Sequence, residues 1–311
     1  MMVTQILLLL FGLALIVFGA DWLVDGSSAI ARKAGISEFV IGLTIVGFGT
    51  SCPELVVSLT GALQGNADIS VGNVVGSNVF NTLLILGLTA VIAPVAVTRE
   101  NRRRDIPIAL LVTVLFAAFS LTDGRITRAE GITYLLVFVA YMIYCFKSDK
   151  GADEAAEEKV HSLALAVLLV VLGLAGLIFG GQLFVNNATA IARALGVSDK
   201  FIAITLLAGG TSFPELATCI VAAAKKKDQL ALGNVLGSNV FNILLILGTS
   251  AVVTPLSTLA LTWVDLGVLL ASAALIWLWT YTGHRDRIDR WEAILMLLLF
   301  FGYYTWLFVK L

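Results

Sequence analysis

A short glutamate motif occurs twice in this chain, each time in the middle of a long apolar stretch. Residues 49–54 are Gly-Thr-Ser-Cys-Pro-Glu, and residues 210–215, at an offset of 161, are Gly-Thr-Ser-Phe-Pro-Glu. A carboxylate near the centre of a bilayer-length helix costs roughly 2.5–3.5 kcal/mol to insert. Glu54 and Glu215 therefore need something that offsets this cost, and a cation shared between them is the simplest candidate.

The composition is that of a membrane protein with many spans. Of 311 residues, 59% are hydrophobic and 13% are charged, whereas soluble proteins carry about 25% charged residues. The apolar runs predict an all-α helical bundle rather than a barrel. Three cysteines in apolar segments indicate no disulfide framework. Ten spans are predicted, over residues 5–30, 36–63, 70–95, 106–121, 128–146, 162–191, 197–224, 231–254, 264–282 and 290–309.

Basic residues are concentrated on one side of this predicted bundle. The connections opposite the N-terminus hold 15 of the 20 Lys and Arg residues. The positive-inside rule makes that side cytoplasmic and puts both termini outside. The run Lys225–Lys227 is interpreted as a topology anchor of this kind.

The repeat extends well beyond the glutamate motif and predicts the architecture. From Val71 to Gly87, 14 of 17 residues are identical to Leu232–Gly248, which indicates a duplication. Residues 1–146 and 162–311 would each hold five helices, joined by a cytoplasmic linker over 147–161. Because five is odd, the second half enters the membrane from the opposite face. Such inverted repeats are typical of secondary transporters with a site at the bilayer midplane.

Each motif predicts a broken helix. Ser51-x-x-Glu54 has the spacing of a capping box, and Pro53 lacks a backbone donor, so a helix should restart here in mid-span. The preceding half-helix would then leave free carbonyl oxygens that can bind a cation. In the next span, Gly72 and Gly76 form a Gly-x-x-x-Gly pair that permits close helix packing, as do Gly233 and Gly237.

The candidate ligands all offer oxygen, which suits hard cations such as Ca²⁺ and disfavours soft transition metals. Asn73 and Asn78 fit an interhelical hydrogen bond as well as ion contact. With two carboxylates the site carries a charge of −2, which one Ca²⁺, two Na⁺ or two H⁺ would neutralise. Asp21 and Asp25 are mirrored by the neutral Gln182 and Asn186, so we assign them a helix-end or packing role. The predicted metal-site residues are Glu54, Glu215, Thr50, Thr211, Ser51, Ser212, Ser77, Ser238, Asn81, Asn242, Gly47 and Ala208.

With these motifs the chain resembles the cation/calcium exchanger superfamily and is similar to prokaryotic members of its sodium/calcium exchanger group. The resemblance rests on the two Gly-Thr-Ser-x-Pro-Glu segments and on Gly-Ser-Asn-x-x-Asn at 76–81 and 237–242. It implies that Glu54 and Glu215 are the principal calcium ligands, that the Thr and Ser residues line the calcium and sodium sites, and that the first and sixth helices slide to alternate access. It also implies a prokaryotic plasma (inner) membrane. Some members, including potassium-dependent ones, carry Asp at the position of Asn242, and the neutral residue here weakens the case for potassium co-transport.

The leading prediction is therefore an antiporter that exchanges Ca²⁺ for Na⁺. An H⁺/Ca²⁺ antiporter of the same fold is the alternative, and a passive cation channel or a membrane scaffold represent other classes. An enzyme is not expected, because no nucleophile–base constellation or phosphate loop occurs. The expected partners are Ca²⁺, Na⁺ and the lipid bilayer. We expect no cofactor, no nucleic acid and no obligatory protein partner.

Overall fold

The computed structural model describes residues 2–149, 151, 162–197, 209–284 and 286–310. Seven of its helices are long and apolar enough to cross a membrane: Met2–Ala34, Ala67–Ile92, Asn101–Thr122, Arg128–Ser148, Leu163–Ala194, Asp228–Val253 and Arg290–Lys310. An eighth span is the bent pair Glu38–Thr50 and Cys52–Leu63, and Trp263–Trp279 is a shorter apolar helix. These nine match nine predicted spans. For the tenth, residues 209–224 are described and 198–208 lie outside the described residues.

The described helices and strands follow one another in a similar order in both halves, although η3 has no described counterpart in the second. The first half comprises α1 (Met2–Ala34), α2 (Glu38–Ile41), η1 (Gly42–Val46), α3 (Gly47–Thr50), α4 (Cys52–Leu63), α5 (Ala67–Val79), η2 (Phe80–Ile85), α6 (Leu86–Ile92), β1 (Val95–Ala96), η3 (Asn101–Asp105), α7 (Ile106–Thr122), β2 (Arg125–Ile126) and α8 (Arg128–Ser148). The second comprises α9 (Leu163–Ala194), η5 (Gly210–Ser212), α11 (Phe213–Ala224), α12 (Asp228–Val240), η6 (Phe241–Leu247), α13 (Gly248–Val253), β3 (Leu256–Ser257), α14 (Trp263–Trp279), β4 (Arg287–Ile288) and α15 (Arg290–Lys310). The predicted linker 147–161 lies largely outside the described residues.

Two short antiparallel ribbons show that the halves are inverted. β1 follows the third span of the first half and pairs with β4, which follows the fourth span of the second half. β2 and β3 pair in the reciprocal way. Within one half, the connection after the third span and the connection after the fourth span lie on opposite faces of the membrane. Their pairing between halves therefore requires that the second half be turned over, as predicted from the odd helix count.

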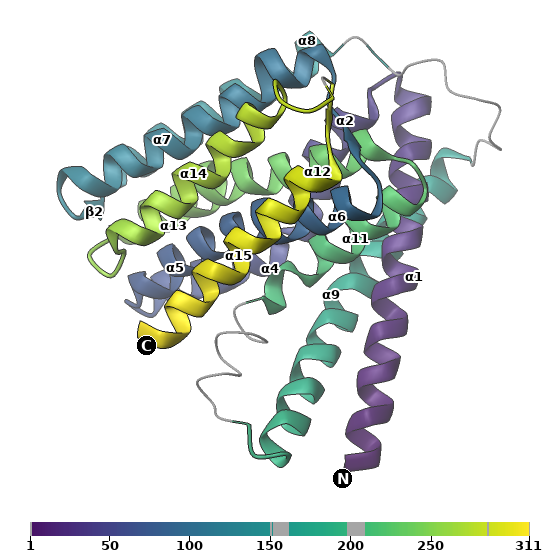
Figure 1. Cartoon of the computed structure of the whole chain (residues 1–311), viewed down its shortest axis with the longest axis horizontal. Coiled ribbons are helices and arrows are strands. Elements are labelled where there is room, and N and C mark those ends of the chain that lie inside the picture. Colours follow the sequence, from purple (N-terminus) through teal and green to yellow (C-terminus); the bar gives the residue numbers. More distant parts are fainter. Residues whose placement is uncertain (1, 150, 152–161, 198–208, 285, 311) are drawn as a thin grey trace.

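α1 and α9 lie side by side at one edge of the bundle (Figure 1). Glycines allow their backbones to touch: a Cβ at Gly19 would lie 2.8 Å from the carbonyl oxygen of Gly173, and one at Gly173 would lie 2.7 Å from that of Gly19. Gly12 and Gly180 meet in the same way two turns away. Small residues at such crossings replace the hydrophobic driving force that is missing between helices in lipid.

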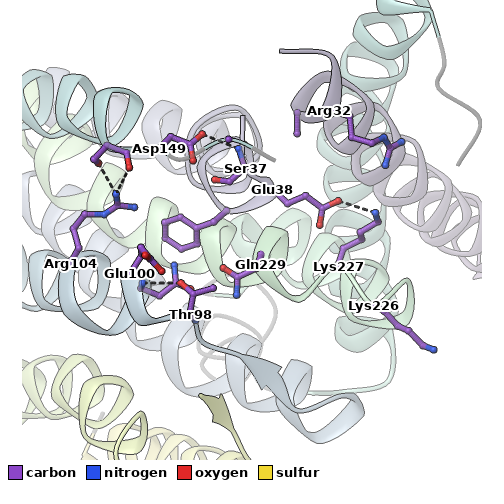
Figure 2. A pocket seen from close by; sticks show the side chains of 15 residues that line it. Arg32, Ser37, Glu38, Thr98, Glu100, Arg104, Asp149, Lys226, Lys227 and Gln229 are labelled. Atoms are coloured by element: carbon purple, nitrogen blue, oxygen red, sulfur yellow. Dashed lines mark hydrogen bonds and ion pairs between the residues drawn. The ribbon is translucent and has the colours of Figure 1, made fainter. Parts of the chain in front are cut away.

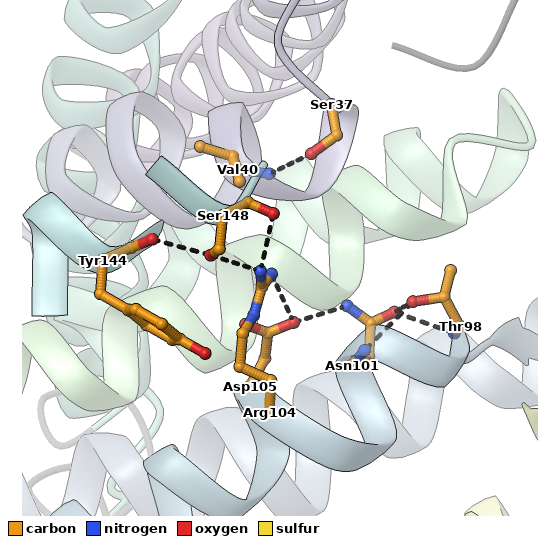
Figure 3. Close-up of polar contacts among 8 residues, drawn as sticks. All are labelled: Ser37, Val40, Thr98, Asn101, Arg104, Asp105, Tyr144 and Ser148. Carbon is orange, nitrogen blue, oxygen red and sulfur yellow. Dashed lines mark hydrogen bonds and ion pairs between the residues drawn. The ribbon is translucent and has the colours of Figure 1, made fainter. Parts of the chain in front are cut away.

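A polar cluster holds the end of α8 against the start of the fourth span (Figure 3). Arg104 donates from Nη1 to the Ser148 hydroxyl at 2.6 Å and from Nε to Asp105 Oδ1 at 2.7 Å. Asn101 Nδ2 donates to the other oxygen of Asp105 at 3.1 Å. Both oxygens of this fully buried carboxylate are thus satisfied, which is the condition for keeping a charge in the interior.

Candidate functional site

The second span is broken where the first glutamate motif predicts it. α3 ends at Thr50, α4 begins at Cys52 with Pro53 in its first turn, and the two parts bend by 48°. The predicted capping box, however, is wrong. Ser51 has φ −83° and ψ 5°, away from the extended conformation of an N-cap, and its side chain makes no capping bond.

The Ser51 hydroxyl instead crosses to the other half of the protein. It donates to Glu215 Oε1 at 2.9 Å, while Ser212 donates to Glu54 Oε1 at 3.0 Å. Each glutamate is thus held by the serine of the opposite motif. This reciprocal exchange brings the two motifs into one site, although they lie 161 residues apart in the chain.

Both carboxylates are fully buried, and each keeps one oxygen free. Glu54 and Glu215 have 0% exposure. Oε2 of each has no hydrogen-bond partner among the described residues. An unpaired carboxylate oxygen away from water costs several kcal/mol. The two free oxygens therefore leave each carboxylate able to accept a further donor or a cation.

Further hydroxyls surround the same carboxylates. Ser77 of α5 lies 3.4 Å from Glu54 Oε1, and Ser238 of α12 lies 3.5 Å from Glu215 Oε1. Ser212 and Ser77 are themselves 3.3 Å apart. Four predicted serines thus contact the two predicted glutamates, with the twofold symmetry of the repeat.

The threonines and backbone carbonyls of the motif lie at the edge of this cluster. The Thr50 hydroxyl donates to the carbonyl of Val46 at 3.0 Å, and the Gly47 carbonyl accepts from Ser238 at 3.4 Å. Gly47 thus faces the second repeat. Thr211 lies in η5 and lines a crevice described below. Ala208 lies outside the described residues.

Asn81 and Asn242 occupy mirrored π-helical turns, η2 and η6. Such turns are rare and occur often at functional sites. Asn242 Nδ2 donates to Asn78 Oδ1 at 2.9 Å, whereas neither amide atom of Asn81 has a partner among the described residues. Both side chains are completely buried. The symmetry of the site is thus broken at this pair.

The remaining amides of these spans make interhelical hydrogen bonds. Asn73 Nδ2 donates to the Glu54 carbonyl at 3.2 Å, and Asn78 Nδ2 donates to the Asn239 carbonyl at 3.2 Å. Gly233 and Gly237 pack as predicted, since a Cβ on either would lie 2.3 Å from a backbone oxygen of the second span. For Gly72 and Gly76 the described residues show no such contact, and the segment that corresponds to their expected partner lies outside the described residues.

A crevice of about 300 Å³ lies between α4 and α9, beside the two glutamate motifs. Cys52, Pro53 and Val56 line one wall, and Gly181, Gln182 and Asn186 line the other. Thr211 of the second motif also lines it. On the opposite side of the site, by contrast, α1 packs along α11.

A larger cavity of about 460 Å³ lies elsewhere and contains none of the predicted site residues. It lies between the ends of several helices, and some of its charged side chains are paired, whereas Figure 2 marks no contact for Lys226. Lys227 contacts Glu38 at 2.9 Å, and Asp149 accepts from the backbone of Ser37 at 2.9 Å. Glu38, Lys227 and Asp149 thus already have partners, unlike the free oxygens of Glu54 and Glu215.

Comparison with known proteins identifies the family and agrees with the fold. The model of the sodium/calcium exchanger protein family matches residues 4–147 and 165–309. The sodium/calcium exchanger MaX1 of Methanosarcina acetivorans is 32% identical over 351 residues, 99% of each chain. The inner membrane protein YrbG of Escherichia coli is 39% identical over 259 residues, 80% of this chain and 79% of YrbG. A structure of the sodium–calcium exchanger NCX_Mj, soaked with Na⁺ and Ca²⁺, superposes with a TM-score of 0.86 at 34% identity, covering 97% of this chain and 98% of the other. Both halves, the inverted fold and the paired glutamate motifs therefore place this chain in the sodium/calcium exchanger family.

Proposed function

We propose that this protein is a secondary antiporter that exchanges Ca²⁺ for Na⁺, with both ions bound between Glu54 and Glu215. The observation that carries the proposal is the pair of buried carboxylates, each with an unpartnered oxygen and each held by the other repeat's serine. The family model and the relationship to MaX1 support ion exchange as the activity.

The oxygen chemistry fits calcium. Ca²⁺ takes six to eight oxygen ligands in flexible geometry. The carboxylates provide four, and Ser51, Ser212, Ser77 and Ser238 add hydroxyls within reach of them. One Ca²⁺ neutralises the formal charge of −2. Two Na⁺ do the same, so competition for the same carboxylates would couple the two fluxes.

Alternating access needs a site open to one face at a time. The crevice between α4 and α9 and the closed packing of α1 on α11 support such an arrangement. We infer that α1 and α9, which pack closely through their glycines, slide as one unit across the core. This movement would switch the site between the states open to either face. The excess of basic residues supports a cytoplasmic location for the connection that holds Lys225, and it supports an outside location for both termini. The similarity to YrbG supports a prokaryotic inner membrane.

The alternative is an H⁺/Ca²⁺ antiporter on the same site. Two buried carboxylates with free oxygens could carry two protons as readily as two sodium ions. The driving ion therefore has to be measured.

The test is uptake of radioactive calcium into proteoliposomes with an imposed sodium gradient or an imposed proton gradient. We expect the sodium gradient to drive uptake, and Glu54→Gln and Glu215→Gln each to abolish it. Glu130→Gln is the matched control, because Glu130 caps α8 and glutamine can serve there. Uptake driven only by protons would overturn sodium coupling. Flux that needs no counter-ion would establish a channel.

A further inference from the structure

Lys225 holds α1 against the end of α11. It is the residue that follows α11, and its Nζ lies 2.6 Å from Asp21 Oδ1 and 2.7 Å from Asp25 Oδ1. The two aspartates are one turn apart on α1. The packing role assigned to them from sequence is therefore incomplete, because both are ion-paired to the opposite half of the protein.

The repeat shows which residues occupy the corresponding three positions on the other side of the site. At the offset of 161, Asp21 and Asp25 correspond to Gln182 and Asn186, and Lys225 corresponds to Gln64. Gln182 and Asn186 line the open crevice between α9 and α4. Gln64 follows the end of α4, as Lys225 follows the end of α11. Two of the three positions thus line an open crevice on one side. On the other side all three are joined by ion pairs.

We propose that Asp21, Asp25 and Lys225 form the gate of the second ion passage, between α1 and α11. In the state seen here the ion pairs keep that passage closed. When α1 moves away, as Gln182 and Asn186 show for the mirrored passage, the two aspartates face the passage and attract incoming cations. The gate rests on the proposed antiport function, since only an alternating transporter needs a second passage.

The local environment suits a contact that must break in each cycle. The side chain of Lys225 is 29% exposed, and those of Asp21 and Asp25 are 45% and 44% exposed. Burial lowers the pKa of Lys225, but its hydrogen bonds to Asp21 and Asp25 outweigh burial and the pKa is raised, so the lysine stays charged. Partly exposed ion pairs are weak enough to open at small cost.

The test uses Cys52, which lines the open crevice and reports whether it is open. Its labelling rate with a membrane-impermeant thiol reagent would be measured in cation-free proteoliposomes, with Cys52→Ser giving the background of the two buried cysteines. We expect Lys225→Gln, which copies Gln64, to slow labelling about two- to fivefold by releasing the closed passage. Lys226→Gln removes the same charge from the same turn and should leave the rate unchanged.

A mutant cycle decides whether the three residues act together. Asp21→Asn/Asp25→Asn should slow labelling as much as Lys225→Gln, and the triple variant should be no slower than either. If the effects of the substitutions on the labelling rate were additive, or if Lys225→Gln had no effect, the proposed gate would be wrong. Labelling needs no transport, so this outcome is separate from failure of the proposed exchange.

Transport from the Lys225 face tests the role of the carboxylates. Lys225→Gln opens the gate and keeps both aspartates, whereas Asp21→Asn/Asp25→Asn opens it without them. We expect the second variant to need about two- to fivefold more Ca²⁺ for half-saturation on that face than the first. If the two variants needed equal Ca²⁺ concentrations for half-saturation, the aspartates would not attract the ion.

Discussion

The hydroxyl of Ser51 donates to Glu215 at 2.9 Å, across the boundary between the two repeats. Its mirror image is the bond from Ser212 to Glu54 at 3.0 Å. Each carboxylate therefore depends on the opposite half of the chain for its hydrogen bond. The site exists only when both repeats are folded and docked.

Removal of either serine hydroxyl should destabilise the cation-free protein by a similar amount. A buried carboxylate that loses its donor costs about 1–3 kcal/mol, so Ser51→Ala and Ser212→Ala should lower the thermal midpoint in detergent without calcium. Ser250→Ala is the control, because Ser250 is buried and its hydroxyl has no partner among the described residues. Midpoints no lower than that of Ser250→Ala would show that the crossed bonds contribute nothing.

Neutralisation of a carboxylate should have the opposite effect on the empty protein. Glu54→Gln and Glu215→Gln remove a buried charge, so we expect their midpoints without cation to equal or exceed that of the wild type. Saturating Ca²⁺ at 100 times its dissociation constant should stabilise the wild type by ~2.7 kcal/mol, and chelation should reverse this. Both variants should lose the calcium-dependent shift, and Glu130→Gln should keep it. A full shift in either glutamine variant would contradict the site.

The sequence was sufficient to predict nine described spans, the inversion and the meeting of the two glutamates, because hydropathy and an odd helix count depend on few assumptions. It was misleading at Ser51, whose spacing to Glu54 suggests a local cap. Spacing within one helix carries no information about a partner in the other repeat. The π-helical turns at Asn81 and Asn242 have no comparable sequence signal. The ion pairs of Lys225 were missed for the same reason as the crossed serines, since their partners lie about 200 residues away.

The contact between α1 and α9 should tolerate no side chain at its crossing. Gly19→Ala and Gly173→Ala would each place a Cβ within 2.8 Å of a backbone oxygen of the other helix. Overpacking of this kind costs about 1–3 kcal/mol, which should appear as a lower thermal midpoint. Gly302→Ala, on an exposed face of helix α15, has nothing within 4 Å of its Cβ in the described part of the chain and should be neutral or stabilising. If all three variants behaved alike, close packing would not be the reason for these glycines.

Asp289 should make the stability of the connection between α14 and α15 dependent on pH. The backbone N–H of His284 donates to it at 2.9 Å and lowers its pKa to about 2, with help from the His284 ring and Arg287. An unfolded aspartate has a pKa near ~3.9, so the stabilisation is complete above that pH and is lost as the pH falls through 2. Asp289→Asn should lower the midpoint at pH 7 and approach the wild type near pH 2. The exposed Asp123→Asn should follow the wild type throughout, and a constant gap for Asp289→Asn would rule out this linkage.

Because the symmetry is broken at Asn81 and Asn242, an aspartate should destabilise the protein more at one of these positions than at the other. Asn242 Nδ2 donates to Asn78 Oδ1, so an aspartate at 242 would put two acceptors face to face. Asn78 cannot turn its amide over without losing the bond from Nδ2 to the Asn239 carbonyl. Asn81→Asp adds the same charge but breaks no hydrogen bond among the described residues. Asn242→Asp should therefore cost about 1–3 kcal/mol more than Asn81→Asp in the cation-free protein. Thermal unfolding of the two variants measures the difference, and equal midpoints would mean that the contact with Asn78 does not hold Asn242 in place.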